Sequence, residues 1–222
     1  MSLTQLLLLY GTFMLISLSG ALSPGPLTAL AIGEGARAGR WAGVRLAAGH
    51  GLVEGVLVFA LAYGLGVWLQ QPLVSGIIGV VGAGVLLWMG YGLLMGAGRG
   101  RLTLAEARDG PAPGVVRWGH VPGGALITVA NPYWVLWWAT LGAVYVARVA
   151  ALQLGLLSVA GLVFTHWLTD LLWLGSLSFV IASGRQLIGE RGYRIILLVC
   201  GAFLAVFGLY FAWSGIRFLV AP

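Results

Sequence analysis

The chain has 222 residues; 60% of them are hydrophobic, 8% are charged, and the formal net charge is +6. A soluble domain carries roughly 25% charged residues, so this composition excludes a soluble globular protein and predicts a membrane protein. The positive charge does not indicate a nucleic-acid partner, because the arginines that carry it lie between the apolar stretches. A single cysteine, Cys200, excludes an internal disulfide.

Six apolar stretches are long enough for the roughly 20 residues that cross a bilayer. They cover residues 3–31, 46–69, 74–97, 121–147, 153–182 and 195–219. The first lacks the basic start and the short apolar core of a cleaved signal peptide, so we expect it to remain as a transmembrane helix. The expected fold is an all-α membrane protein with six transmembrane helices in a single domain over residues 1–222.

The arginines distinguish the two sides of the membrane. Ten of the twelve lie in the first, third and fifth connections, at positions 37, 40, 45, 99, 101, 108, 117, 185, 191 and 194. The positive-inside rule then predicts a multi-pass protein of the inner membrane with the odd connections in the cytoplasm and both termini outside. The polar composition of residues 105–113, within the third connection, predicts a flexible cytoplasmic segment.

Prolines interrupt the first and fourth stretches. The residues concerned are Ser23, Pro24, Gly25 and Pro26 in the first stretch, and Asn131 and Pro132 in the fourth. Serine and asparagine are favoured N-caps and proline suits the first helical position, so Ser23-Pro24 and Asn131-Pro132 are each expected to start a half-helix within the membrane. Such an N-terminus presents free N–H groups and the positive end of the helix dipole. We therefore predict that both breaks bind an anionic group of a substrate; the alternative is a pair of proline kinks without a ligand.

Two histidine–acid pairs lie inside the apolar stretches. His50 and Glu54 in the second stretch, like His166 and Asp170 in the fifth, are four residues apart and share a helical face. Ionisable groups in a span usually face a cavity or a partner, and histidine titrates near physiological pH. The pairs are predicted to couple protons, and the two acids are also candidates for binding a substrate ammonium group. Two alternatives stay open: hydrogen bonds that only tie helices together, and a metal site.

These features recur in the same order in the two halves of the chain. Repeat one covers residues 1–98, repeat two covers 119–222, and the cytoplasmic connection 99–118 joins them. Because each repeat has three spans, the second is expected to be inverted relative to the first. Inverted repeats are common in secondary transporters, whose substrate sites lie near the midplane at broken helices. We thus expect two inverted three-helix repeats with breaks in helices 1 and 4.

Tryptophan, glycine and the third histidine support less specific predictions. Trp134, Trp137 and Trp138 follow the second break and could line a site, although lipid contact is the expected role for most of their surface. The glycines between residues 76 and 96 predict close helix approach, either within the fold or in a dimer. His120 is expected to be interfacial rather than functional.

The residues 23–26, followed by Gly39, Gly43 and Gly49, resemble the N-terminal signature of the LysE/RhtB-type amino-acid exporters of the LysE superfamily. Asn131-Pro132 is similar to that family's second motif. The resemblance implies a secondary exporter of amino acids or related small metabolites, driven by the proton gradient, without a cofactor and as a homodimer.

The sequence departs from the family pattern at two positions. Leu27 stands where many members have a polar residue, and Tyr133 stands where many have lysine. Because related families move metal ions, a divalent cation exporter that uses the histidine–acid pairs is the alternative function. An enzyme is not expected, because the chain has neither a serine or cysteine nucleophile elbow nor zinc-protease spacing.

Overall fold

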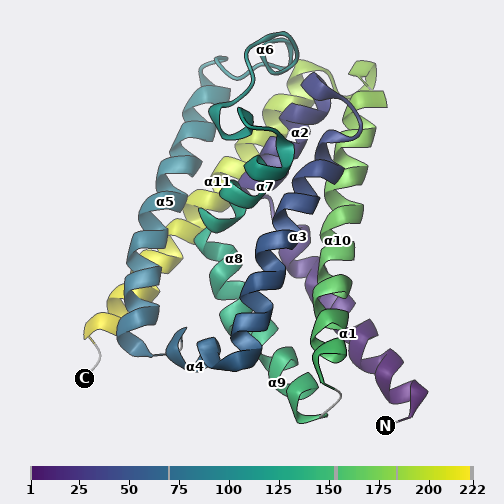
Figure 1. Ribbon diagram of the computed structural model, residues 1–222. Coiled ribbons are helices and arrows are strands. Elements are labelled where there is room, and N and C mark those ends of the chain that lie inside the picture. The colour runs from purple at the N-terminus through teal and green to yellow at the C-terminus, as the bar shows by residue number, and fades with distance from the viewer. Residues whose placement is uncertain (1, 70, 153–154, 184, 221–222) are drawn as a thin grey trace.

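The computed structural model describes residues 2–69, 71–152, 155–183 and 185–220, and every regular element in these ranges is a helix (Figure 1). In chain order the elements are α1 (Leu3–Ala21), α2 (Pro26–Ala38), α3 (Ala42–Ala60), the wide turn η1 (Leu61–Leu65), α4 (Gly66–Leu69), α5 (Pro72–Gly98), α6 (Leu104–Asp109), the short turn η2 (Gly114–Val116), α7 (His120–Val129), α8 (Pro132–Trp137), the wide turn η3 (Trp138–Gly142), α9 (Ala143–Ala151), α10 (Leu156–Ser183) and α11 (Arg185–Val220).

Within the described residues, six helical segments are long and apolar enough to cross a membrane, as predicted. They are Thr4–Ala21, Ala42–Leu65, Pro72–Gly98, Pro132–Ala151, Leu156–Ser183 and Gly189–Val220. The sixth begins at Gly189, earlier than expected. Gly189 adopts a φ of +55° and separates the first turn of α11 from the rest of the helix. At the expected breaks, the short helix α2 follows the first crossing helix and the short helix α7 precedes the fourth.

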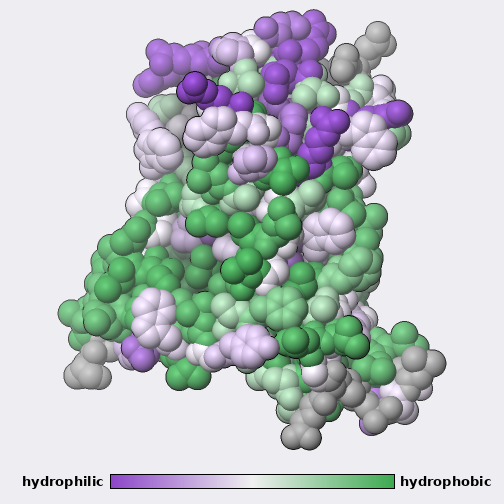
Figure 2. Space-filling model, in the orientation of Figure 1, coloured by the Kyte–Doolittle hydropathy of each residue, from purple (hydrophilic) through white to green (hydrophobic). Residues whose placement is uncertain are grey.

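The two ends of the bundle differ in polarity. Figure 1 places both termini at the end opposite α6. Hydrophilic side chains gather at the α6 end, and an apolar band lies below them (Figure 2). Both termini therefore lie on the same side, and the arginine-rich connections occupy the other side.

Helices α5 and α11 pack against each other along their length, and glycines make this approach possible. A Cβ at Gly79 would lie 2.8 Å from the Cα of Gly215, and one at Gly90 would lie 2.9 Å from the carbonyl oxygen of Gly201. Gly84, in contrast, faces open space. The glycines that are packed in α5 thus serve the fold of one chain.

The connection between α5 and α7 is more ordered than predicted. The Thr103 side chain caps α6, and the Glu190 carboxylate accepts the N–H groups of Leu104 and Ala105 at 2.8 and 2.9 Å. The prediction of a flexible segment is therefore wrong for α6. Glu190 lies 85 residues further along the chain than Ala105, so the composition of the segment could not reveal this bond.

Candidate substrate cavity and histidine–carboxylate ring

The first helix break lies between α1 and α2, but its cap differs from the prediction. Gly25 is the N-cap and Pro26 is the first residue of α2, while the Ser23 hydroxyl donates to the carbonyl of Gly20. A residue before proline avoids the α conformation, and Gly25 is extended, with φ −109° and ψ −175°. The prediction that Ser23 caps a helix starting at Pro24 is therefore wrong, because the helix starts at the second proline, Pro26.

The second break, between α7 and α8, has the predicted cap. Asn131 is extended, its Oδ1 atom accepts the N–H of Tyr133 at 3.1 Å, and Pro132 is the first residue of α8. The two half-helix starts consequently differ. Asn131 uses its own side chain to satisfy α8, whereas no side chain among the described residues caps α2.

The cap at Asn131 can be tested by mutation. Asn131→Ala should lower the stability by about 1 kcal/mol, because the N–H of Tyr133 loses its acceptor. Asn131→Ser, which can still cap, should unfold close to the unchanged protein in a thermal unfolding series in detergent. Equal unfolding midpoints for the alanine and serine variants would contradict a capping role.

Both breaks open onto one cavity of about 60 Å³. Its polar lining includes Ser23, Thr28, His50, Thr128, Asn131, Tyr133, His166 and Asp170. Gly25 also lines it, but Pro24, Pro26 and Pro132 do not. Pro132 instead packs where a Cβ at Gly82 would stand. The prolines therefore shape the breaks, while their neighbours face the cavity.

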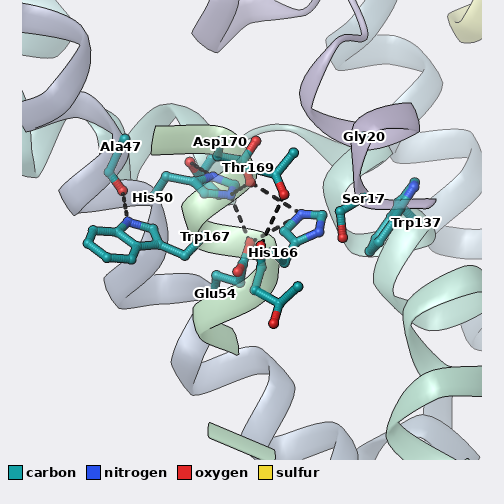
Figure 3. Close-up of polar contacts among 12 residues, drawn as sticks. Ser17, Gly20, Ala47, His50, Glu54, Trp137, His166, Trp167, Thr169 and Asp170 are labelled. Carbon is teal, nitrogen blue, oxygen red and sulfur yellow. Dashed lines mark hydrogen bonds and ion pairs between the residues drawn. The ribbon is translucent and has the colours of Figure 1, made fainter. Parts of the chain in front are cut away.

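The four histidine and acid residues form a ring beside this cavity (Figure 3). His50 and Glu54 come from α3, and His166 and Asp170 come from α10; all four are buried. His50 Nε2 lies 2.8 Å from Glu54 Oε2 and 3.3 Å from Asp170 Oδ2. His166 Nε2 lies 3.5 Å from Glu54 Oε2 and 3.3 Å from Asp170 Oδ2. Nitrogen and oxygen atoms thus alternate around the ring, and each acid contacts both histidines.

Thr128, at the end of α7, determines which nitrogen of His50 carries hydrogen. The Thr128 hydroxyl donates to the carbonyl of Gly124 at 2.7 Å and lies 3.0 Å from His50 Nδ1. Since a hydroxyl has one hydrogen, Nδ1 is the donor and the threonine oxygen accepts. In a neutral His50 the lone pair of Nε2 would then face a carboxylate oxygen of Glu54 at 2.8 Å. A cation, either a proton or a metal ion, is needed between these two atoms.

Three buried atoms of the ring residues have no hydrogen-bond partner among the described residues. They are Glu54 Oε1, His166 Nδ1 and Asp170 Oδ2. Asp170 Oδ2 approaches both histidines but lacks hydrogen-bond geometry to either. Ligand atoms of His50, Glu54, His166 and Asp170 all lie within 4.8 Å of one another, so these residues could hold a metal ion. The ring therefore has unused capacity for a cation.

Aromatic side chains surround the ring and the cavity. Trp137 and Trp138 are buried, with ring centroids 4.5 and 5.0 Å from that of His166. Trp134 and Trp137 line the cavity. The expectation that these tryptophans mainly contact lipid is therefore wrong for Trp137 and Trp138. Apolar character alone does not distinguish a buried side chain from one that faces lipid.

A third buried acid, Glu34, was not among the residues that the sequence pattern singled out. Glu34, in α2, is 1% exposed; its carboxylate accepts both Nε and Nη2 of Arg37, and His120 Nε2 lies 2.8 Å from its Oε2 atom. Glu34 also lines a cavity of about 710 Å³ at the α6 end. The spacing to Arg37 was a usable signal, but the bond to His120 spans 86 residues. His120 thus ties α7 to α2.

Glu34→Gln should destabilise the protein by about 2 kcal/mol, because half-buried Arg37 loses its ion-pair partner and the amide cannot accept the same set of hydrogen bonds as the buried carboxylate. The matched control is Asp109→Asn, which removes the acid of an exposed pair with Arg108 and should leave the thermal unfolding midpoint unchanged. Equal thermal unfolding midpoints for the Glu34→Gln and Asp109→Asn variants would show that the buried pair contributes no stability.

The helices and the buried polar cavity define a multi-pass membrane protein, and the family comparison gives its class. The family model described as LysE type translocator matches residues 18–215. The chain therefore belongs to the LysE translocator family. A protein of Bacillus subtilis (strain 168) named "Putative amino acid efflux protein YcgF" is 24% identical over 212 residues, covering 94% of this chain and 97% of that protein. No solved structure shows a significant match.

Proposed function

We propose that this protein is a secondary active exporter of amino acids or related small metabolites. The observation that carries the proposal is the convergence of two helix breaks and a buried histidine–carboxylate ring on one cavity among membrane-spanning helices. Membership of the translocator family supports export, and the name of the Bacillus subtilis relative supports amino acids as the substrate class.

The substrate carboxylate binds at the start of α2 in this proposal. The N-terminus of α2 has no side-chain cap among the described residues, and a helix N-terminus favours an anion. Ser23 and Asn131, which line the same cavity, offer a hydroxyl and an amide for hydrogen bonds to the carboxylate. Because Asn131 already caps α8, the free N–H groups come from α2 rather than from both breaks.

The substrate ammonium group binds at Asp170. This acid lines the cavity, as do Trp134 and Trp137, and aromatic rings in such a lining favour a cation. Glu54 is fully buried and does not line the cavity, so its role in the proposal is to exchange protons with His50 and His166. The proton gradient would drive export through these exchanges.

Alternating access by two inverted repeats completes the proposal. The reciprocal contacts in the ring support it, because His50 of the first half faces Asp170 of the second and His166 faces Glu54. Under the positive-inside rule the arginine-rich α6 end faces the cytoplasm.

Purified protein in liposomes tests the proposal directly. Vesicles with an imposed pH gradient should accumulate at least one radiolabelled amino acid from a broad panel, and a protonophore should abolish the accumulation. Protein-free vesicles provide the baseline. An absence of pH-dependent flux across the whole panel, with correctly folded protein, would overturn the proposal.

A further inference from the structure

We infer that the ring of His50, Glu54, His166 and Asp170 is a binding site for a divalent transition-metal ion of the Zn²⁺ or Co²⁺ type. The inference concerns binding: an ion in the ring takes the place of the proposed protons and of the ammonium group at Asp170, so metal and substrate would compete for this acid. The inference rests on the spacing of the four ligand atoms, on unpartnered polar atoms of Glu54, His166 and Asp170, and on the hydrogen bond that orients His50.

The size of the ring fits a four-coordinate ion. Four ligands at about 2.0–2.2 Å in a tetrahedral arrangement are separated from one another by about 3.3–3.6 Å. Three of the four edges of the ring measure 3.3, 3.3 and 3.5 Å, and the fourth, from His50 to Glu54, measures 2.8 Å. The His50–Glu54 edge must widen for an ion to enter, and the separations across the ring, which are at most 4.8 Å, must fall within the same range.

The surroundings of the ring favour a metal ion over an empty site. Asp170 Oδ2 and Glu54 Oε1 are buried without a hydrogen-bond partner among the described residues, which is costly for carboxylates away from water. Thr128 keeps the hydrogen of His50 on Nδ1 and leaves the Nε2 lone pair directed at the ring. A hydrogen bond from the second nitrogen of a histidine is the usual support for a metal-binding imidazole.

The ligand set selects the class of ion. Two imidazole nitrogens and two carboxylate oxygens suit zinc and neighbouring transition metals, whereas Ca²⁺ takes six to eight oxygens and Mg²⁺ an octahedral shell. With neutral histidines the two carboxylates carry two negative charges, so one divalent ion balances the ring. His50, His166 and Asp170 all line the cavity, which provides a way in for the ion.

Titration of tag-free protein in detergent with Co²⁺ and with Zn²⁺ tests the inference. We expect one ion per chain, with the intense visible absorption of four-coordinate Co²⁺, and displacement of that absorption by Zn²⁺. Asp170→Asn should remove the absorption. Thr128→Val, which keeps the shape of the side chain but loses its hydroxyl, should weaken binding about tenfold or more, and Thr128→Ser should restore it.

His120→Gln is the control, because this histidine lies outside the ring and its replacement should leave binding intact. Circular dichroism and gel filtration without metal establish that each variant is folded. The inference is overturned if no stoichiometric ion binds, if binding is lost in His120→Gln, or if binding is kept at full strength in folded Asp170→Asn or Thr128→Val. Metal binding without amino-acid flux would overturn only the proposed function, and flux without metal binding would overturn only this inference.

Discussion

Glu54→Gln is expected to stop uphill export while the substrate still binds. Glu54 is completely buried and contacts both ring histidines, but it does not line the cavity. The amide keeps the shape of the carboxyl group and removes its capacity to take up and release a proton. Transport driven by a pH gradient should therefore fall by about a hundredfold or more, equivalent to about 2.7 kcal/mol, because the amide cannot exchange protons with the two ring histidines.

Asp170→Asn should lose both transport and substrate binding. Asp170 belongs to the same ring, but it also lines the cavity and is the proposed partner of the ammonium group. The two variants therefore separate coupling from binding, although both replace an acid by its amide.

Two measurements compare these variants. Flux into liposomes under a pH gradient reports coupling, and the shift of the thermal unfolding midpoint with added amino acid reports binding. Glu54→Gln should retain the ligand-induced shift, and Asp170→Asn should not. If Glu54→Gln keeps the full gradient-driven flux, the ring does not couple protons to export, and Glu54 has a structural role in transport.

Gly49→Ala, in α3, should be strongly destabilising. A Cβ at Gly49 would overlap the carbonyl oxygen of Val121 and contact the backbone nitrogen of Ala125. Gly124 makes the reciprocal approach, because a Cβ there would meet the backbone of Leu46. Two helix backbones cannot yield as a flexible side chain can, so we expect a loss of about 3 kcal/mol or a failure to fold.

Gly55→Ala, in the same helix, is the matched control. The nearest atom to a Cβ at Gly55 is Val163 Cγ1 at 3.8 Å, an ordinary contact. Alanine also has the higher helix propensity, by about 0.8–1.0 kcal/mol. The thermal unfolding midpoint in detergent should fall for Gly49→Ala and stay level or rise for Gly55→Ala. Similar midpoints would mean that α3 and α7 are not packed backbone to backbone.

Several parts of the site could be predicted because their signals are local in the sequence. Asn131-Pro132 caps and starts a helix through neighbouring atoms, and the pairs His50/Glu54 and His166/Asp170 share a helical face by their spacing. The first break shows the limit of such reasoning, since two prolines lie two residues apart and either could start α2. Only the three-dimensional structure identifies Pro26 as the first residue.

Other parts depend on packing between distant segments and leave no local signal. Thr128 is an ordinary residue of an apolar helix until His50, 78 residues earlier, is placed against it. The same holds for Glu34 and His120. The six spans follow from apolar length alone, but the side of each helix that is buried depends on its neighbours.

The hydrogen bond between Thr128 and His50 couples the position of α7 to the tautomer of the His50 imidazole. Thr128 lies in the last turn of α7, three residues before Asn131, where the chain breaks. A tilt of α7 about this break would withdraw the hydroxyl from His50 Nδ1 and free the imidazole to change tautomer or rotate. The affinity of His50 Nε2 for a cation would then depend on the position of α7. A small displacement of the α7 backbone would therefore strengthen or weaken the binding of a cation at His50.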